Sequence, residues 1–382
     1  MGSVFGNNLK LSIFGESHGE AIGCVLDGFP YGINIDNNFI ESEMERRRAK
    51  NNKLSTTRQE SDKVEILSGV FYNISTGMPI ASIIKNENKR SGDYSNLKVL
   101  PRPSHSDYTA MLRYEGFNDI RGGGHFSGRL TAPLVFAGAL AKLALKEKFD
   151  INIAGHIKQI YNIKDKYPND ELPSYEDFIK NYNKELSVFD DDAMNKMIST
   201  IEKAKLNMDS VGGIITAVAF NVPAGFGDPF YSSIESRIAS SMFAVPAVKG
   251  VEFGIGFDFV NYKASECNDA YTIKESNNIK TIETKTNNNG GILGGISNGM
   301  PIVVNVAIKP TPSISKEQLT LNIETKEEEV LTIKGRHDPC IAVRAVAVVE
   351  AALAISILDL CLDMKGKIYW NNHIWNIYKI LF

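Results

Sequence analysis

Three successive glycines, Gly122–Gly124 in the stretch DIRGGGHFSGRLTAP at Asp119–Pro133, constrain the fold of this chain most. Glycine has no Cβ, so these residues can take backbone angles closed to other residues and bring main-chain N–H groups close to a bound group. The apolar run Pro133–Leu145 follows, with a helix-forming composition. We expect Thr131 to cap that helix and Pro133 to lie in its first turn.

A glycine loop that leads into a helix N-terminus predicts an anion site. Arg121 and Arg129 flank the glycines, so a phosphate or a carboxylate is the expected occupant. The loop is not a dinucleotide fingerprint, because Ser127 stands where the third glycine of G-x-G-x-x-G would fall, and no G-K-[ST] follows as in a P-loop. A purely structural turn is the alternative interpretation.

The composition is that of a globular protein. The 382 residues are 43% hydrophobic and 23% charged, and a net charge of −3 gives no general attraction to nucleic acid or to an anionic membrane. An anionic ligand must therefore be held by a local cluster of bases. The N-terminus lacks a charged region followed by a long apolar run, so we expect no signal peptide. The cysteines are scattered, which fits a reduced compartment and argues against a cysteine zinc site: Cys24, Cys267, Cys340 and Cys361.

The most apolar segment is Cys340–Leu362. It contains Arg344, Glu350 and Asp359, which favours a buried helix over a membrane span. The sequence shows no repeat of fixed period and no interdomain linker, so we expect one domain over residues 1–364. We assign no role to the tail at residues 365–382.

Two further loops place histidine among small or stiff residues. The turn Gly15–Gly19 follows an expected strand and presents His18. Prolines flank Arg102 and hold a loop extended that also contains His105 and Asp107, a combination suited to acid–base chemistry. An ordinary polar surface loop is the alternative in both cases.

Local patterns also predict individual elements. Ile35–Arg48 is expected to be a helix capped by Asp36 and ending in a basic run, which a solvated helix C-terminus would also explain. Asp338 before Pro339 suits an N-cap with proline at N1, which would explain that aspartate without any chemistry. Cys267–Asn289 is expected to be a polar loop.

Taken together, these segments resemble the chorismate synthase family over nearly the whole chain, from Phe14 to about Leu360. The matching motifs are, in order, GESHG at Gly15–Gly19, RRR at Arg46–Arg48, ESDKVEILSGVF at Glu60–Phe71, RSGDYS at Arg90–Ser95, the His105 loop, RGGG at Arg121–Gly124, VPAGFGDP at Val222–Pro229, AVKGVEFG at Ala247–Gly254, GGILGGISNG at Gly290–Gly299, KPT at Lys309–Thr311 and GRHDP at Gly335–Pro339.

The resemblance implies a carbon–oxygen lyase of the shikimate pathway. It would eliminate phosphate in a 1,4 sense from 5-enolpyruvylshikimate 3-phosphate to give chorismate. The resemblance also implies reduced FMN as a cofactor with no net redox change, NADPH as a possible reductant, and a cytoplasmic homotetramer. The implied fold is α+β, a sandwich with helices between antiparallel β-sheets. A substrate with two carboxylates and a phosphate requires a cluster of arginines and lysines.

The resemblance also implies roles for individual residues. His18 and His105 would be acid groups near flavin and phosphate, and Asp338 would work with flavin N5 in taking the proton. The FMN shell would contain His125, Phe126, Ser127, Ala247, Gly294, Lys309, Pro310, Thr311, Pro312, Ser313 and Arg336. NADPH or a substrate anion would be bound by Arg47, Arg48 and Lys53. The substrate would be bound by Arg48, Arg58, Arg102 and Arg129.

A few positions depart from the family's usual pattern. The motif RPGHAD is replaced by RPSHSD at Arg102–Asp107, with Ser104 and Ser106 at the small positions. His125 stands where arginine is commoner after the triple glycine. Lys53 replaces an arginine and offers a point charge in place of a planar fork.

Two other classes of function remain open at the level of sequence. An NADPH:FMN oxidoreductase is weakened by the missing dinucleotide fingerprint. A non-catalytic anion-binding protein would need the arginines but not His18, His105 and Asp338 together, and the presence of that set argues against it.

Overall fold

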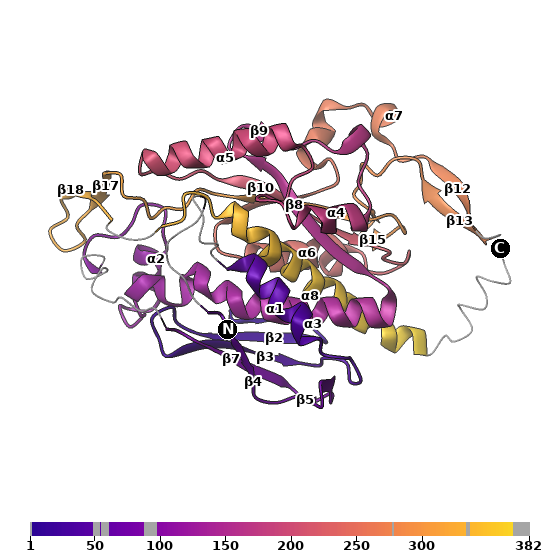
Figure 1. Ribbon diagram of the computed structural model, residues 1–382, viewed down its shortest axis with the longest axis horizontal. Coiled ribbons are helices and arrows are strands. Elements are labelled where there is room, and N and C mark those ends of the chain that lie inside the picture. The colour runs from indigo at the N-terminus through magenta and orange to yellow at the C-terminus, as the bar shows by residue number, and fades with distance from the viewer. Residues whose placement is uncertain are drawn as a thin grey trace.

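Two five-stranded antiparallel sheets enclose a layer of helices in this protein (Figure 1). The computed structural model describes residues 2–48, 54, 61–87, 98–276, 279–333 and 337–369. The arrangement confirms the predicted α+β sandwich. The helices between the sheets are α1 (Asn37–Arg47), α3 (Thr131–Phe149), α6 (Ile234–Phe243) and α8 (Ala342–Tyr369).

Each sheet is built from antiparallel neighbours. The first sheet has the order β1 (Val4–Phe5), β2 (Lys10–Gly15), β3 (Ala21–Asp27), β7 (Ile80–Lys85) and β4 (Val64–Ile66). The second has the order β11 (Val248–Phe253), β16 (Ile302–Ile308), β10 (Gly213–Phe220), β8 (Asn152–Ile160) and β9 (Ile163–Lys164).

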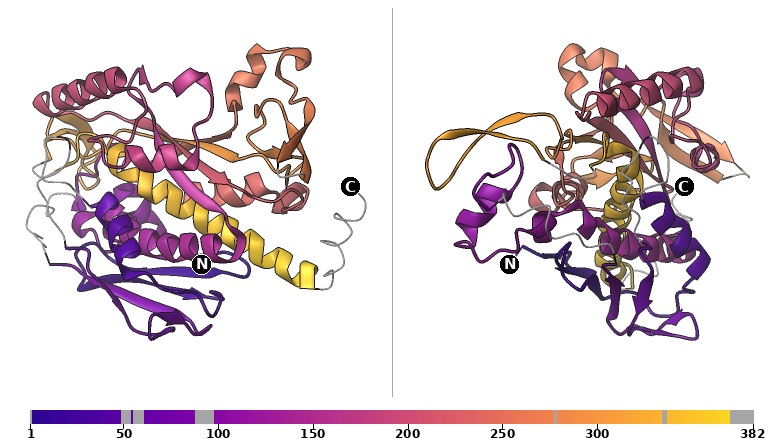
Figure 2. Two further views of the ribbon diagram at one scale, coloured as in Figure 1. Left: turned by 45° about the vertical axis from the view of Figure 1, so that its right-hand side comes forward. Right: turned by 60° about the vertical axis from the view of Figure 1, so that its left-hand side comes forward.

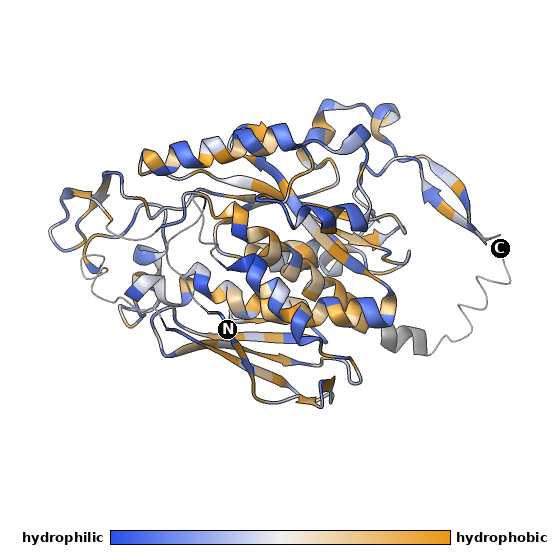
Figure 3. Cartoon of the chain, viewed as in Figure 1, coloured by the Kyte–Doolittle hydropathy of each residue, from blue (hydrophilic) through white to orange (hydrophobic). Residues whose placement is uncertain are grey.

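Helices α3 and α8 are largely apolar and lie side by side at the centre (Figures 1 and 3). Two stretches containing them, Gly128–Phe149 and Ala342–Met364, are long and apolar enough to cross a membrane, with mean hydropathies of 1.3 and 2.2. Inside the protein, however, 78% and 89% of their most apolar windows are buried. Burial between the sheets therefore accounts for their composition, as expected for Cys340–Leu362.

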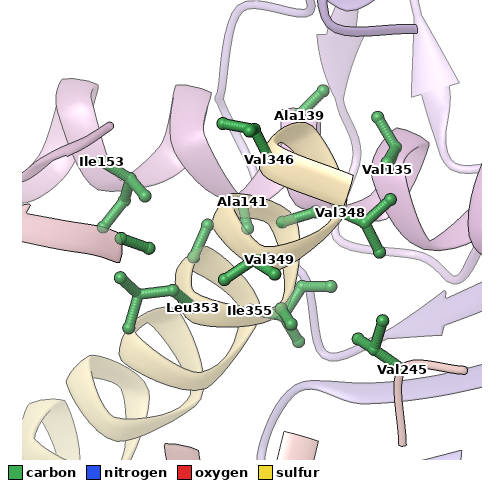
Figure 4. Close-up of a cluster of buried hydrophobic side chains, with 14 of the residues drawn as sticks. Val135, Ala139, Ala141, Ile153, Val245, Val346, Val348, Val349, Leu353 and Ile355 are labelled. Carbon is green, nitrogen blue, oxygen red and sulfur yellow. The ribbon is translucent and has the colours of Figure 1, made fainter. Parts of the chain in front are cut away.

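The seam between α3 and α8 is packed with small and branched side chains. Figure 4 shows Val346 and Val349 of α8 among residues of α3 and of the second sheet. At the closest approach, a Cβ on Gly138 would collide with the Cα and Cβ atoms of Ala351. Glycine costs about 1 kcal/mol relative to alanine inside a helix, so Gly138 is explained by this close approach of α8.

The two sheets repeat one order of elements. The first half runs β2, β3, α1, β4, β7, α3, and the second runs β8, β10, α6, β11, β16, α8. Corresponding strands have the same neighbours, β2-β3-β7-β4 in one sheet and β8-β10-β16-β11 in the other. The sequence showed no repeat, because the correspondence lies in strand order and not in a residue period.

The remaining elements lie around this core. Helix α5 (Asp191–Leu206) covers the side of the second sheet away from α8 (Figures 1 and 2). Three further short helices are α2 (Asp107–Arg113), α4 (Tyr175–Asn181) and α7 (Ala264–Cys267). Hairpins are formed by β5–β6 (Val70–Phe71, Ile74–Ser75), β12–β13 (Tyr271–Ser276, Ile279–Thr284), β14–β15 (Ile292–Leu293, Ile296–Ser297) and β17–β18 (Gln318–Leu321, Glu328–Leu331). The 3-10 turns are η2 (Arg121–Phe126), η3 (Gly128–Leu130), η4 (Pro168–Asp170), η5 (Phe230–Ser232) and η6 (Gly256–Asn261).

The expected cap at Thr131 is wrong. Thr131 is the first residue of α3, and the turn η3 precedes it. Ser127 caps that turn by accepting a hydrogen bond from the N–H of Arg129 at 3.3 Å. The Thr131 hydroxyl instead donates to the carbonyl of Gly128 at 2.6 Å and accepts from Nε of Arg47 at 3.0 Å.

Two other local predictions are also wrong. Helix α8 begins at Ala342, so Asp338 is not its N-cap and Pro339 is not at N1. The segment Cys267–Asn289 contains the hairpin β12–β13, which projects from the body of the molecule (Figure 1). The tail expected from residue 365 begins inside α8, and residues 370–382 lie outside the described part of the chain.

Candidate active site

A cavity of about 1140 Å³ lies where corresponding connections of the two halves meet. The loops that lead into α3 and α8 form part of its wall, as do the connections after α1 and α6 and the N-terminal strand β1. Pockets for one small ligand usually measure about 300–1,000 Å³. This cavity therefore has room for more than one small molecule.

The triple glycine forms a tight bend at the cavity wall. Gly122, Gly123 and Gly124 have φ values of +61°, +88° and +53°, which other residues rarely adopt. A Cβ on Gly122 would collide with the imidazole of His18, and one on Gly123 would lie 3.3 Å from Cε1 of His105. The glycines thus allow both predicted histidines to approach the loop backbone. Behind the bend, Ser17 Oγ lies 3.1 Å from Nδ1 of the buried His18.

His105 is held by a carboxylate on one side of its ring. Its Nδ1 lies 2.6 Å from Oδ1 of Asp107, so Nδ1–H donates and Nε2 is left for a ligand. Arg102 donates hydrogen bonds to the same carboxylate from Nε and NH2, each at 2.7 Å, and donates from NH1 to Ser313 at 3.0 Å. Arg102 NH2 also approaches Nδ1 of His105 at 3.0 Å, but a protonated Nδ1 cannot accept a hydrogen bond from it. Burial opposes the charge of Asp107, yet hydrogen bonds from Arg102 and His105 lower the pKa of that carboxyl far below its usual range.

Asp62 joins two buried arginines of the site, Arg47 and Arg129. Its Oδ2 accepts from NH1 of Arg47 at 2.7 Å, and its Oδ1 accepts from NH1 of Arg129. Burial lowers the pKa of Arg47 to about 10, although Asp62 opposes that effect. Burial raises the pKa of Asp62 and the arginines lower it, with a net lowering. The Asp62 carboxylate and the Arg47 guanidinium are therefore charged at neutral pH.

Asp338 lies at the cavity and is oriented by the first turn of α8. Arg344 donates to its Oδ2 at 2.7 Å and to the backbone carbonyl of Arg47 at 3.0 Å. This ion pair, and not a helix cap, explains the position of Asp338.

The residues expected to bind flavin lie along another part of the wall. His125 donates a hydrogen bond from Nδ1–H to the carbonyl of Gly15 at 2.9 Å, because a carbonyl oxygen can only accept. Lys309 donates from Nζ to the carbonyl of Ser104. Burial and the nearby Lys249 lower the pKa of Lys309. Among the described residues Thr311 Oγ1 is buried without a hydrogen-bond partner. Two cations and a free hydroxyl suit a phosphate group.

Most of the predicted site residues are brought together here. Those lining the cavity are Arg47, Arg102, His105, His125, Phe126, Ser127, Arg129, Ala247, Lys309, Thr311, Pro312, Ser313 and Asp338. His18 is buried behind Gly122. Pro310 and Gly294 are not among the lining residues, and Gly294 lies in the turn of the hairpin β14–β15. Lys53, Arg58 and Arg336 lie outside the described part of the chain.

Arg48 points away from this cavity. Its NH2 pairs with Oε1 of Glu41 at 2.7 Å, and it lines a separate cavity of about 40 Å³ with Arg46 and Tyr182. Its role in anion binding stays a prediction.

Sequence reasoning missed Asp62, Lys249, His337 and Arg344, all of which line the cavity. Arg344 had a usable signal, because a charge in the first turn of an apolar helix requires a partner. Asp62 had a weaker one, since a buried basic run requires a counter-charge somewhere in the chain. Lys249 and His337 lie inside the quoted motifs AVKGVEFG and GRHDP, but neither gives a local sign of its position.

Comparison with known proteins shows the family of this chain. A sequence model of the family described as Chorismate synthase matches residues 9–362. Chorismate synthases of Archaeoglobus fulgidus, Thermococcus kodakarensis and Methanocaldococcus jannaschii are 44%, 44% and 42% identical to this chain over 366, 361 and 365 residues. The alignments cover 96%, 94% and 94% of this chain and 98%, 98% and 96% of those relatives.

A solved structure described as "Crystal Structure of Chorismate Synthase" has the same fold, with a TM-score of 0.70 and 28% sequence identity. The match covers 94% of this chain and 93% of that chain. The protein is therefore an enzyme, a lyase of the shikimate pathway, and the chain belongs to the chorismate synthase family.

Proposed function

We propose that this protein eliminates phosphate from 5-enolpyruvylshikimate 3-phosphate in a 1,4 sense, with reduced FMN bound and no net redox change. The proposal rests on one observation: buried arginines, the His105–Asp107 pair and the Asp338–Arg344 pair lie at the same cavity. A substrate with a phosphate and two carboxylates matches this excess of cations.

The residues present fit a flavin mononucleotide. Beside the lysines Lys249 and Lys309, the buried hydroxyl of Thr311 lacks a partner among the described residues, as a phosphate-binding group would before its ligand is added. An apolar wall suited to a flat ring lies nearby in the lining: Val245, Ala247, Ile341, Ala345 and Val348. The volume of about 1140 Å³ accommodates both a cofactor and a substrate.

The arginines would bind and neutralise the departing phosphate. Arg47 and Arg129 are fixed by hydrogen bonds before any ligand arrives, so little reorganisation is needed when charge develops on the leaving group. The N-termini of α3 and α8 lie at the same cavity and favour negative charge there.

His105 and Asp338 would handle protons. His105 is held by Asp107 and offers Nε2 to a ligand, while Asp338 is held by Arg344 and offers a carboxylate to take a proton. Reduced FMN, when bound, supplies an electron-rich centre that eases departure of phosphate. NADPH is a possible source of its electrons.

We also propose a cytoplasmic homotetramer. Apolar side chains on the projecting hairpins β12–β13 and β17–β18 are exposed in a single chain, which supports burial against further copies (Figures 1 and 2). They are Tyr271, Ile273, Ile282, Leu319, Leu321 and Val330.

The reaction is tested by anaerobic phosphate release from 5-enolpyruvylshikimate 3-phosphate with dithionite-reduced FMN, followed together with chorismate absorbance. NADPH then replaces dithionite. Release with both reductants indicates a lyase that reduces its own flavin, and release with dithionite alone indicates an external flavin source. No release from folded protein that binds FMN contradicts the proposal. Rapid NADPH oxidation without phosphate release would favour a flavin reductase.

Asp338→Asn separates catalysis from binding in the same assay. We expect turnover to fall by about 10²–10⁴-fold, because a positioned base is lost, while substrate affinity changes little. Asp209→Asn is the control, since that aspartate pairs with Lys316 and does not line the cavity. Unchanged turnover in Asp338→Asn would remove this residue from the mechanism.

A further inference from the structure

A buried carboxylate occupies the centre of the anion-binding cluster. Asp62 is 1% exposed, while Arg47 and Arg129 are 4% and 6% exposed, and all three line the cavity. The chain reaches this position in a left-handed conformation, with a φ of +49° at Asp62. A strained backbone at a buried charged residue indicates that the carboxylate is held there by the surrounding structure.

Both arginines keep N–H groups for a ligand. Arg47 donates to Thr131 at 3.0 Å, to Asp62 at 2.7 Å and to the carbonyl of Gly128 at 3.1 Å. Three of its five N–H groups are thus engaged with described residues.

Arg129 is held in the same way. It donates to Asn86 at 3.0 Å, to the carbonyl of Lys85 at 3.4 Å and to Asp62. Its remaining N–H groups, like those of Arg47, donate to none of the described residues, and both side chains line the cavity, where an anion would accept from them.

Asp62 also sets the net positive charge of the cluster that faces a bound anion. Two guanidiniums would present two positive charges, and the shared carboxylate cancels one of them. The neighbouring Arg344 is itself balanced by Asp338. The site binds a phosphate ester and must later release inorganic phosphate. A lower net positive charge weakens binding of this product, and tight product binding would slow turnover.

We propose that Asp62 is a positioning residue that fixes the guanidiniums of Arg47 and Arg129 and, by cancelling one of their charges, allows inorganic phosphate to leave. This inference rests on the proposed phosphate elimination. The Asp62 carboxylate accepts hydrogen bonds from both arginines and thereby weakens their attraction for the phosphate product. Binding of the ester then depends on directed N–H groups more than on net charge.

The test is inorganic phosphate binding to the full chain without flavin, measured by calorimetry for the wild type and Asp62→Asn. Asparagine is nearly isosteric and tolerates a left-handed backbone. Removing one negative charge close to the ligand should tighten phosphate binding by about ten- to a hundredfold. During turnover, the KM for the ester and kcat should both fall, with stronger inhibition by added phosphate. Unchanged or weaker phosphate binding overturns the proposal.

Two further variants exclude simpler explanations. Asp62→Glu keeps the charge, so phosphate affinity should stay within about threefold of wild type even if kcat falls through misplacement. Asp165→Asn removes another buried carboxylate, which pairs with His156 away from the cavity, and should leave phosphate affinity unchanged. Tighter phosphate binding in either variant would contradict the charge argument.

Failure of this inference and failure of the proposed reaction give different results. If wild type releases phosphate from the ester but Asp62→Asn does not bind inorganic phosphate more tightly, only this inference fails. If wild type shows no release, the proposed function fails, whatever the affinity of Asp62→Asn. Should Asp62→Asn not fold, Asp62→Ser is a second neutral variant. Failure of both to fold would assign Asp62 to the fold alone and overturn the proposal.

Discussion

At the scale of single residues, Ser104 occupies a position that favours glycine. Its φ of +59° lies in the left-handed region, which glycine adopts without a steric penalty. Its carbonyl accepts a hydrogen bond from Nζ of Lys309, and the next residue is His105. The conformation of Ser104 therefore positions both a cation and the histidine that we propose as an acid–base group.

We predict that Ser104→Gly folds at least as well as wild type and keeps activity, because it relieves left-handed strain without changing the carbonyl. Ser104→Val should lose about 1–2 kcal/mol of unfolding free energy, since a branched side chain is disfavoured in this conformation. Urea unfolding measures both. Equal stability of the valine and glycine variants would contradict the backbone argument.

Residue-level predictions from sequence succeeded where the requirement is local. The glycines at Gly122–Gly124 were predicted to take unusual backbone angles near a bound group, and the structure gives positive φ at all three. Asp338 was ambiguous, because capping and chemistry both suit an aspartate before proline. Its real partner is Arg344, and the ion pair depends on where α8 begins, which no local pattern gives.

At the scale of elements, three charged residues in the apolar helix α8 each hold another part of the chain in place. Arg344 holds Asp338, Glu350 joins Arg46 and Lys142, and Asp359 holds the N-terminal segment. Asp359 accepts from the backbone N–H groups of Asn7, Asn8 and Leu9 at 2.8–3.1 Å, just after strand β1.

We predict that Asp359→Ala destabilises the protein by about 2–3 kcal/mol, because it leaves backbone N–H groups without their acceptor. Asp363→Ala, one turn further along α8, should cost about 0–1 kcal/mol, since its contacts with Arg237 and Asn8 are nearer the surface. Thermal and urea unfolding give the two values. Similar losses in both variants would contradict an anchoring role of Asp359.

A buried ionic cluster joins α1, α3 and α8. Glu43 and Glu350 share Arg46 and Lys142, and Tyr182 donates to Glu350 at 3.0 Å. Burial opposes the charge of Glu43, but Lys142 and Arg46 prevail and lower its pKa below the ordinary value of 4.5. The stability contributed by this depressed pKa is present above pH 4.5 and is lost as the pH falls further.

We predict that Glu43→Gln lowers stability at pH 7 by about 3–5 kcal/mol, because it leaves buried cations without a partner. The variant should also lose less stability than wild type between pH 4.5 and pH 3. Glu41→Gln on the same helix is the control, since Glu41 is exposed and pairs only at the surface. Urea titrations across pH check this, and parallel wild-type and Glu43→Gln profiles would exclude the assignment.

The hairpin β12–β13 shows why some elements escape sequence analysis. Tyr271, Ile273 and Ile282 are exposed in the single chain, and polar residues separate them. The described side chains of this hairpin add nothing to the hydrophobic core, and the apolar–polar alternation of Tyr271 and Ile273 stops at Glu275, too early to reveal a half-buried strand. By contrast, the turn Gly15–Gly19 was expected to follow a strand, and β2, which packs on the helices, ends at Gly15.

At the scale of the whole molecule, the two halves meet along α3 and α8, and both supply walls of the cavity. Arg47 ends α1 and Asp62 lies in the connection from α1 to β4, while Ala247 lies in the corresponding connection between α6 and β11. The order of elements makes this symmetry visible, whereas the sequences of the halves do not.

We predict that Gly138→Ala pushes α3 and α8 apart and lowers the free energy of unfolding by about 1–3 kcal/mol, because its methyl group would overlap Ala351. Activity should fall with stability, since the cavity spans the seam. Adding Ala351→Gly returns the missing space and should restore both. Unfolding and turnover measurements on the single and double variants test this, and an unaffected Gly138→Ala protein would contradict the close packing.

A cavity shared between two halves makes its occupant part of what holds them together. A ligand that touches both walls binds the assembled fold and not its separated parts, so occupancy shifts the unfolding equilibrium by mass action. At a ligand concentration a hundred times Kd, this linkage adds about 2.7 kcal/mol. The stability of the folded enzyme therefore depends on the concentration of the small molecules that bind in its cavity.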